Sequence, residues 1–157
     1  MTGSAPVRVR ERMFWCRPDA LAVWVAHVVE EIRARREAPD WLQTLGQDWG
    51  IAAGFPDFGL HWDPDDDESL AVVTRLCQHA CARARAAGDL TAERLRSWHI
   101  LDGISVADGT GGRPVEADRV LEVAGAFSAL LDGTLPPDPP GAAWFFGTGE
   151  GPQTTDR

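Results

Sequence analysis

The clearest helical pattern in the chain is PDALAVWVAHVVEEIRARR, residues 18–36. Apolar side chains recur there at i, i+4, i+7 and i+11, which predicts one buried helix face: Leu21, Val25, Val28 and Ile32. Pro18 suits the first turn of a helix, and the arginines at the far end lie where the helix dipole is negative. Pro39 cannot continue a helix, so we expect this first helix to end before it.

Caps and apolar spacing predict further helices along the rest of the chain. Their expected ranges are 40–53, the acidic cap region 63–68 to Gly88, Thr91 to about Asp102, and 115–131. We therefore predict a single globular domain, residues 1–157, with a mainly α fold: a helical bundle of four to five helices. This prediction leaves room for a small β element near 58–62 or 98–107, and an α+β fold is the alternative.

The two ends of the chain differ in composition from its middle. We expect residues 1–12 and 147–157 to be flexible. Four prolines precede Trp144-Phe145-Phe146 in the C-terminal part. A free aromatic triplet would be an exposed apolar patch, so we expect it to fold back and dock on the body.

The overall composition is that of one ordinary soluble domain. The chain has 157 residues, of which 44% are hydrophobic and 25% charged, and this length is enough to bury a core. Lys, Asn and Tyr are absent while Arg reaches 15; because the three missing residues have AT-rich codons, we attribute this bias to a GC-rich bacterial genome. Every apolar run is shorter than the roughly 18 residues needed to cross a bilayer, so we expect no membrane partner.

Cysteine usage and the N-terminal region indicate a cytoplasmic protein. Cys16, Cys77 and Cys81 are odd in number and too few for a disulfide framework, so we expect reduced thiols. Several arginines precede the apolar run 20–29, which imitates a signal peptide. However, Pro18-Asp19 separates the two parts and no small-residue cleavage site follows, so a helix is the better interpretation.

Negative charge is concentrated in residues 37–68, which we call the acidic segment. It holds nine acidic side chains and no Arg or Lys, so its formal charge equals the −9 of the whole chain. Five large aromatic side chains lie in the same segment: Trp41, Trp49, Phe55, Phe58 and Trp62. Mixed acidic and aromatic content is typical of a binding surface, and the net charge disfavours nucleic acid while it attracts a basic protein partner. The predicted binding residues are Trp41, Trp49, Trp62, Asp63, Asp65, Asp66 and Asp67.

Two familiar metal-binding patterns are incomplete in this chain. An EF-hand loop counted from Asp63 needs a glycine at its sixth position and a glutamate at its twelfth, but Glu68 and Thr74 stand there. Cys77 and Cys81 lack the second cysteine pair that completes a structural zinc site. We therefore expect no bound cofactor, and a helix-capping role for the acidic run.

A small metal-dependent or ligand-processing enzyme is the alternative function. Imidazoles and carboxylates that share helix faces could bind a divalent ion inside a bundle, and the candidates are His27, Glu31, His61, His99 and Asp102. Neither a Gly-x-Ser-x-Gly elbow nor a phosphate-binding loop is present, and Cys16 near a helix start is a weak candidate nucleophile. Whether the chain is an enzyme stays open; a protein-binding module of the inhibitor or immunity type is the preferred prediction.

Overall fold

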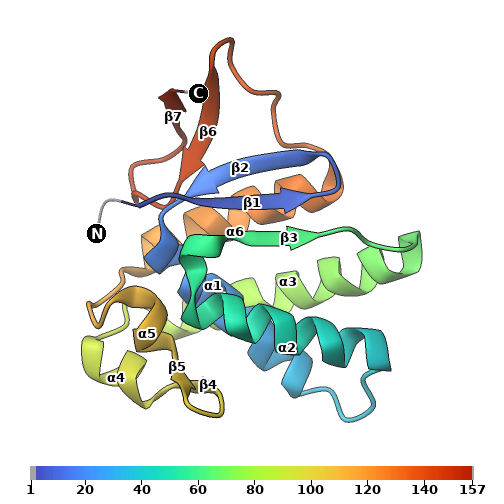
Figure 1. Ribbon diagram of the computed structural model, residues 1–157, viewed down its shortest axis with the longest axis vertical. Helices are drawn as coiled ribbons and strands as arrows, with labels where there is room; N and C mark the ends of the chain where they lie inside the picture. The colour runs from blue at the N-terminus through green and yellow to red at the C-terminus, as the bar shows by residue number, and fades with distance from the viewer. Residues whose placement is uncertain (1–2, 157) are drawn as a thin grey trace.

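The computed structural model describes residues 3–156 and has an α+β fold (Figure 1). Its helices are α1 (Pro18–Arg33), α2 (Asp40–Gly54), the short 3-10 helix η1 (Pro56–Phe58), α3 (Asp67–Ala87), α4 (Ala92–Ser97), α5 (Val106–Thr110) and α6 (Ala117–Asp132). Its strands are β1 (Ala5–Val9), β2 (Arg12–Cys16), β3 (Leu60–Trp62), β4 (His99–Leu101), β5 (Ile104–Ser105), β6 (Ala142–Phe146) and β7 (Gln153–Asp156). Among these described residues, no helix is both long and apolar enough to cross a membrane.

The main sheet has five strands in the order β3-β1-β2-β6-β7. β1 and β2 form an antiparallel hairpin, while β3 pairs with β1, and β6 pairs with β2, in parallel. The long helices lie on one side of this sheet, and α6 packs directly against it (Figure 1). Burial along β1 alternates accordingly, because Val7 and Val9 are buried and Arg8 between them is exposed.

The predicted mainly α bundle is wrong, because the chain is 53% helical and 19% strand, with a five-stranded mixed sheet and a two-stranded sheet of β4 and β5. The turn between β1 and β2 lacks an Asn-Gly or Asp-Gly signal, and Arg10 adopts the left-handed conformation there with φ 56°. The parallel pairings join distant segments, which local patterns do not report. The small β elements do lie where the sequence left room for them, within 58–62 and 98–107.

α1 is the central helix of the fold, and its predicted start at Pro18 is confirmed. Thirteen of its sixteen residues are buried, because α2, α3, α5 and α6 all pack against it. A helix that is apolar on all sides is a core helix rather than a surface helix. The single apolar face predicted from the spacing is therefore too narrow a description of α1.

Aromatic side chains join α1, α2, β3 and α6 in the core. Trp24 and Trp49 both pack edge-on against Phe127, with ring centroids 6.2 and 5.8 Å apart. Trp49 also packs edge-on against Trp62, with ring centroids 6.0 Å apart and an angle of 90° between the ring planes. Each such pair contributes about 0.5–1.5 kcal/mol beyond the area that it buries. Trp49 and Trp62 are therefore part of the hydrophobic core.

The predicted limits of α2, α3 and α6 are confirmed closely. α2 begins at Asp40 and ends at Gly54, and α3 ends at Ala87 with Gly88 as its C-cap. Asp66 caps α3, since its carboxylate accepts hydrogen bonds at 2.7 Å from both the backbone N and the Oγ of Ser69. A cap of this kind stabilises a helix by about 1 kcal/mol.

The region after α3 departs from the prediction. Thr91 caps α4 as expected, but the helix ends at Ser97 and not near Asp102, because β4 and β5 form a hairpin. α5 was not predicted; at its start, Ser105 N donates to the Asp108 carboxylate at 2.9 Å, as in a capping box. Five residues of helix after a short strand are too few to produce a periodic pattern.

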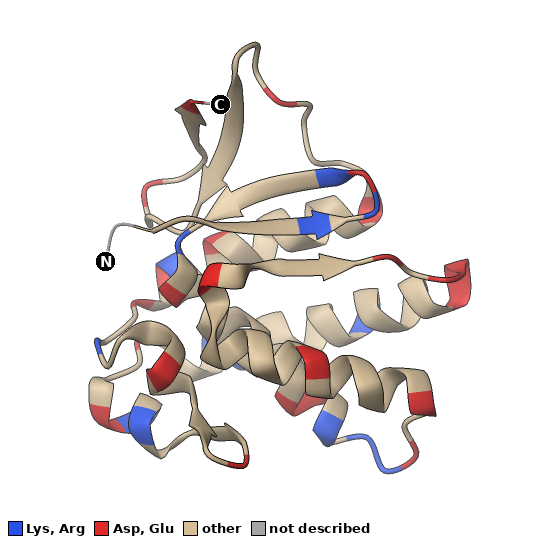
Figure 2. Cartoon of the chain, viewed as in Figure 1, with Lys and Arg blue, Asp and Glu red and all other residues tan. Residues whose placement is uncertain are grey.

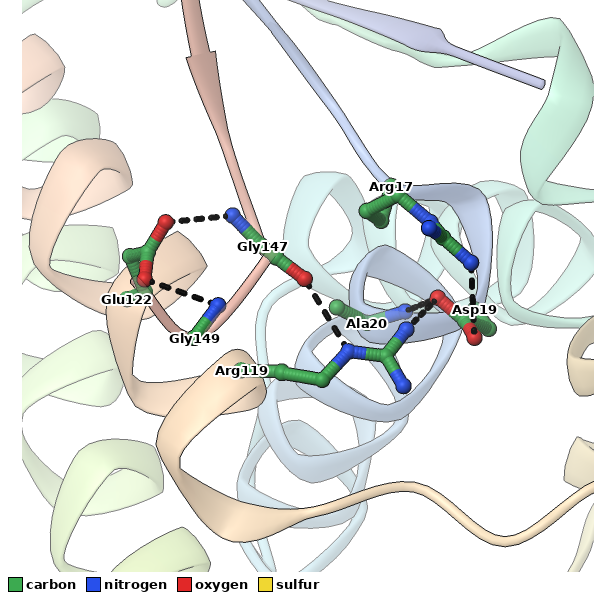
Figure 3. A network of polar contacts seen from close by, with 7 residues as sticks. All are labelled: Arg17, Asp19, Ala20, Arg119, Glu122, Gly147 and Gly149. Atoms are coloured by element: carbon green, nitrogen blue, oxygen red, sulfur yellow. Dashed lines mark hydrogen bonds and ion pairs between the residues drawn. The ribbon is translucent and has the colours of Figure 1, made fainter. Parts of the chain in front are cut away.

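A network of hydrogen bonds and ion pairs connects the segment between β6 and β7 to α6 and α1 (Figure 3). The Glu122 carboxylate accepts hydrogen bonds at 2.8, 3.1 and 3.0 Å from three backbone N–H groups: those of Gly147, Gly149 and Gly151. Arg119 donates from Nε to Gly147 O at 3.1 Å and from Nη2 to Asp19, which also pairs with Arg17. Arg119 of α6 therefore links the segment after β6 to buried Asp19 at the start of α1.

Both ends of the chain contribute strands to the sheet. The predicted docking of Trp144-Phe145-Phe146 is confirmed, because these residues lie in β6, where Phe145 and Phe146 pair with β2 and Trp144 pairs with β7. Flexibility was predicted for residues 1–12 and 147–157; within them β1 and β7 are formed. Residues 1, 2 and 157 lie outside the described part of the chain.

Candidate functional site

A small groove lies between α2 and the loop that joins β3 to α3, and we call it the acidic groove. Its volume is about 130 Å³, and its aromatic and acidic lining side chains are Trp41, Asp48, Trp62, Asp63 and Asp65. The fold thus brings together four of the residues predicted from the sequence. It adds Asp48, which lies about two turns along α2 from Trp41 and was not among the predicted residues.

The acidic groove is strongly negative. Asp48, Asp63 and Asp65 are exposed carboxylates, and no Arg or Lys of the described residues lines the groove. Figure 2 shows the same imbalance on a larger scale: α2, the loop after β3 and the start of α3 carry acidic positions and no basic ones. His61 Nε2 lies 3.1 Å from Asp63 Oδ2, so an imidazole stands beside these carboxylates. The arrangement is suited to attract a cation.

A row of exposed apolar side chains continues from the acidic groove along α2. Ile51, Phe55 and Phe58 are 50%, 50% and 87% exposed, and they are the exposed large hydrophobic residues of the described chain. Asp48 and Ile51 are spaced i, i+3 on one face of α2, and Phe55 follows directly after the last residue of this helix. We call Ile51, Phe55 and Phe58 the apolar row, and the apolar row with the acidic groove the α2 surface.

The position of Phe58 is set by a tight contact between η1 and β1. Phe58 N donates to Phe55 O at 3.4 Å, and Gly59 N donates to Pro56 O at 2.9 Å. Gly59 has φ 78°, and a Cβ at this position would lie only 2.2 Å from Pro6 O. Only glycine fits such an approach, and it lets the chain hold Phe58 outward beside the end of α2.

Most of the predicted binding residues pack in the core or stabilise the start of α3. Trp49 is 2% and Trp62 9% exposed, and Trp41 packs partly against the core. Asp66 is the α3 cap, and the hydrogen bonds from Ser69 hold the pKa of Asp66 below its usual range. Asp67 is exposed in the first turn of α3, where the helix dipole favours a negative charge.

The five candidate metal ligands do not converge on one point. Glu31 pairs with Arg83 and lies 3.8 Å from His79, while His61 faces Asp63. His27 is buried against Trp98, with ring centroids 4.8 Å apart. The remaining two, His99 and Asp102, line a different cavity. Within residues 3–156, no group of three or more His, Cys, Asp or Glu side chains is arranged to hold a metal ion.

The buried thiols of Cys16 and Cys77 are poor nucleophiles in this environment. Cys16 is fully buried and its Sγ lies 3.6 Å from Ala5 O, to which it donates. Burial and the nearby Asp19 carboxylate raise the pKa of Cys16, and burial raises that of Cys77. Since the thiolate is the reactive form, the suggestion that Cys16 is a nucleophile is wrong for this structure.

Comparison of the chain with family models, with curated proteins and with solved structures finds no match. Its function is therefore inferred from the α2 surface itself. The sequence-based prediction does not include the apolar row, because it takes the tryptophans of the acidic segment as the side chains that anchor a partner. The position of Ile51 on α2, opposite Leu42 and Trp49, with Phe55 directly after the helix, was the signal that could have found it.

Proposed function

We propose that this chain is a protein-binding module, of the inhibitor or immunity type, that docks a basic protein partner on the α2 surface. One observation carries the proposal. The exposed large hydrophobic residues of the described chain all lie in the acidic segment, which has nine acidic side chains and no Arg or Lys. Exposed apolar side chains rimmed by charge of one sign are typical of a protein interface.

The acidic groove would receive one basic side chain of the partner. Its volume of about 130 Å³ is below the roughly 300–1,000 Å³ of small-molecule pockets, so it suits a side chain better than a cofactor. Three carboxylates can accept charge-assisted hydrogen bonds from an Arg or Lys head group. The indole of Trp41 beside them offers a face for a cation.

The apolar row would supply the desolvated part of the interface. Phe58 is the most exposed of its three side chains, and burying a phenyl ring contributes about 1.5–3 kcal/mol. Aromatic anchors of this kind often dominate binding energy, whereas exposed charges mainly raise the association rate. We therefore expect the acidic groove to affect mainly the association rate, and the apolar row to affect mainly the dissociation rate.

Neutralising the acidic groove with Asp48→Asn, Asp63→Asn and Asp65→Asn is expected to slow association with the partner by about tenfold at low salt. Asp66 is left intact because it caps α3. The partner is first captured from an extract of the host, and association rates are then measured for wild type and variant. The difference should shrink as salt rises, because these carboxylates are exposed and screened.

A matched variant removes the same charge elsewhere: Glu93→Gln, Glu116→Gln and Asp118→Asn, all exposed. It should associate at the rate of wild type. Equal slowing by both triple variants would show that only net charge matters and would contradict a site on the α2 surface. A partner consisting of a second copy of this chain would appear as a concentration-dependent oligomer and would contradict a foreign basic partner.

Replacing Phe58 with Ser is expected to speed dissociation of the partner by about tenfold without changing thermal stability. The reason is that an 87% exposed side chain contributes little to the folded core but is available to a partner. Dissociation kinetics and a thermal melt check the two halves of this prediction. If the dissociation rate were unchanged, the apolar row would not be part of the interface.

A further inference from the structure

A second cavity lies on the other side of α2, between the end of α1, the loop that follows it and β4. Its volume is about 620 Å³, within the roughly 300–1,000 Å³ typical of small-molecule sites. α2 contributes Gln43, Gly46 and Gln47 to its wall. At 100° per residue Gln43 and Gly46 point away from Asp48, and no residue that lines this cavity belongs to the α2 surface, so the two sites are distinct.

The floor of this cavity is apolar. It is formed by side chains from α1 and β4 that are buried or half-buried: Val29, Ile32, Ile100 and Leu101. Gly46 lies close against α1, since a Cβ there would be 3.1 Å from Ile32 Cγ2. A floor of aliphatic side chains between packed elements is suited to the apolar body of a ligand.

The rim of the cavity is basic, in a chain whose net charge is −9. Arg33, Arg35 and Arg36 line it together with His99, and Asp102 is the one acidic side chain of the lining. Figure 2 shows the corresponding basic positions at the end of α1 and on the loop that follows. The lining thus has a formal charge of +2 with His99 neutral, whereas that of the acidic groove is −3.

The three arginines differ in how far they are already paired. Arg33 Nη1 pairs with Glu30 at 3.1 Å and donates to Ile100 O at 2.9 Å, so its guanidinium is held in place. Arg35 and Arg36 are exposed and form no ion pair with any residue between 3 and 156. Two uncompensated guanidiniums beside an apolar floor present forked donors for an anionic group.

From these observations we infer that the cavity binds a small molecule with an apolar body and an anionic head group, such as a carboxylate, sulfonate or phosphate. The body lies on the floor formed by α1 and β4. The head group lies against Arg35 and Arg36, away from Asp102. This site is separate from the proposed partner interface, because none of its lining residues belongs to the α2 surface.

Fluorescence titration with 1-anilinonaphthalene-8-sulfonate, an aromatic sulfonate, tests the inference. Wild type is expected to bind the probe saturably. Arg35→Gln with Arg36→Gln is expected to weaken binding by about tenfold or more, because the head group loses both forked donors. Ala38→Trp places an indole at the cavity wall and should weaken binding without any change of charge.

Three controls distinguish binding in this cavity from binding elsewhere on the protein. Arg75→Gln with Arg85→Gln makes the same charge change on exposed positions of α3 and should leave probe binding unchanged. Phe58→Ser should also leave it unchanged. The neutral probe N-phenyl-1-naphthylamine should bind wild type and the Arg35/Arg36 variant equally.

The inference is overturned if the Arg35/Arg36 variant binds the sulfonate as tightly as wild type. It is also overturned if the Arg35/Arg36 variant and the Arg75/Arg85 variant weaken sulfonate binding equally. Loss of binding in Phe58→Ser alone would place the probe on the apolar row and would equally overturn it. None of these results bears on the proposed partner interface, which is tested by protein association.

Discussion

Replacement of Asp19 by Ala is expected to lower the free energy of unfolding by about 3 kcal/mol. The Asp19 side chain is 9% exposed, and it neutralises Arg119, which is 16% exposed, and Arg17. Its Oδ1 also accepts a hydrogen bond from Ala20 N at 2.8 Å. Without the carboxylate, two guanidiniums remain in a partly buried position with no counter-charge, and this residual charge is the main cost. Urea unfolding at neutral pH measures the effect.

Asp118→Ala is the matched control for this prediction. Asp118, like Asp19, is an acidic side chain in the first turn of a helix, but it is exposed. It should therefore lose only the dipole contribution of about 0.3–1 kcal/mol. If Asp19→Ala were no more destabilising than Asp118→Ala, the network in Figure 3 would not be holding α1, α6 and the C-terminal strands together.

Acidification is expected to destabilise the fold through His27 by about 3 kcal/mol between pH near 7 and pH about 4. Burial, and secondarily the positive charge of Arg83, lowers the pKa of His27 from 6.5 to about 4. Well above pH 6.5 the imidazole is neutral in both the folded and the unfolded chain, so its contribution to stability is constant. As the pH falls from 6.5 to about 4, the unfolded chain binds a proton that the folded chain does not, and stability is lost.

A variant separates His27 from the carboxylates that also titrate in this range. His27→Leu removes the titrating group, so its free energy of unfolding should fall by about 3 kcal/mol less than that of wild type over this pH interval. Equal pH dependence of wild type and His27→Leu would mean that the His27 imidazole is protonated as readily in the folded chain as in the unfolded chain.

The helices were predictable from sequence where their signals are local. Pro18 at the start of α1, Asp66 and Gly88 at the ends of α3, and Thr91 at the start of α4 each act within one helical turn. The sheet was not predictable in this way. Its parallel pairings connect β1 with β3 and β2 with β6, and their stability depends on packing that no local window contains.

The candidate site was predictable in its charge but not in its anchors. The count of acidic residues in the acidic segment needs no structure, and the fold does place Asp63 and Asp65 beside Trp41. Burial, however, is a tertiary property: Trp49 and Phe55 are both large and apolar, yet Trp49 lies in the core and Phe55 is half-exposed. Which of them can meet a partner is decided by the rotation of α2 against α1.

Hydroxyl-radical footprinting of the chain, free and in the complex captured from its host, tests the central claim most directly. Phe58, Phe55 and Trp41 are oxidised according to their exposure to solvent. If the α2 surface is the interface, oxidation of Phe58 and Phe55 should fall sharply in the complex, while that of Trp15 on β2 stays unchanged. Unchanged oxidation of Phe58 in a complex that salt dissociates, or protection of Trp15 in its place, would contradict a partner interface on the α2 surface.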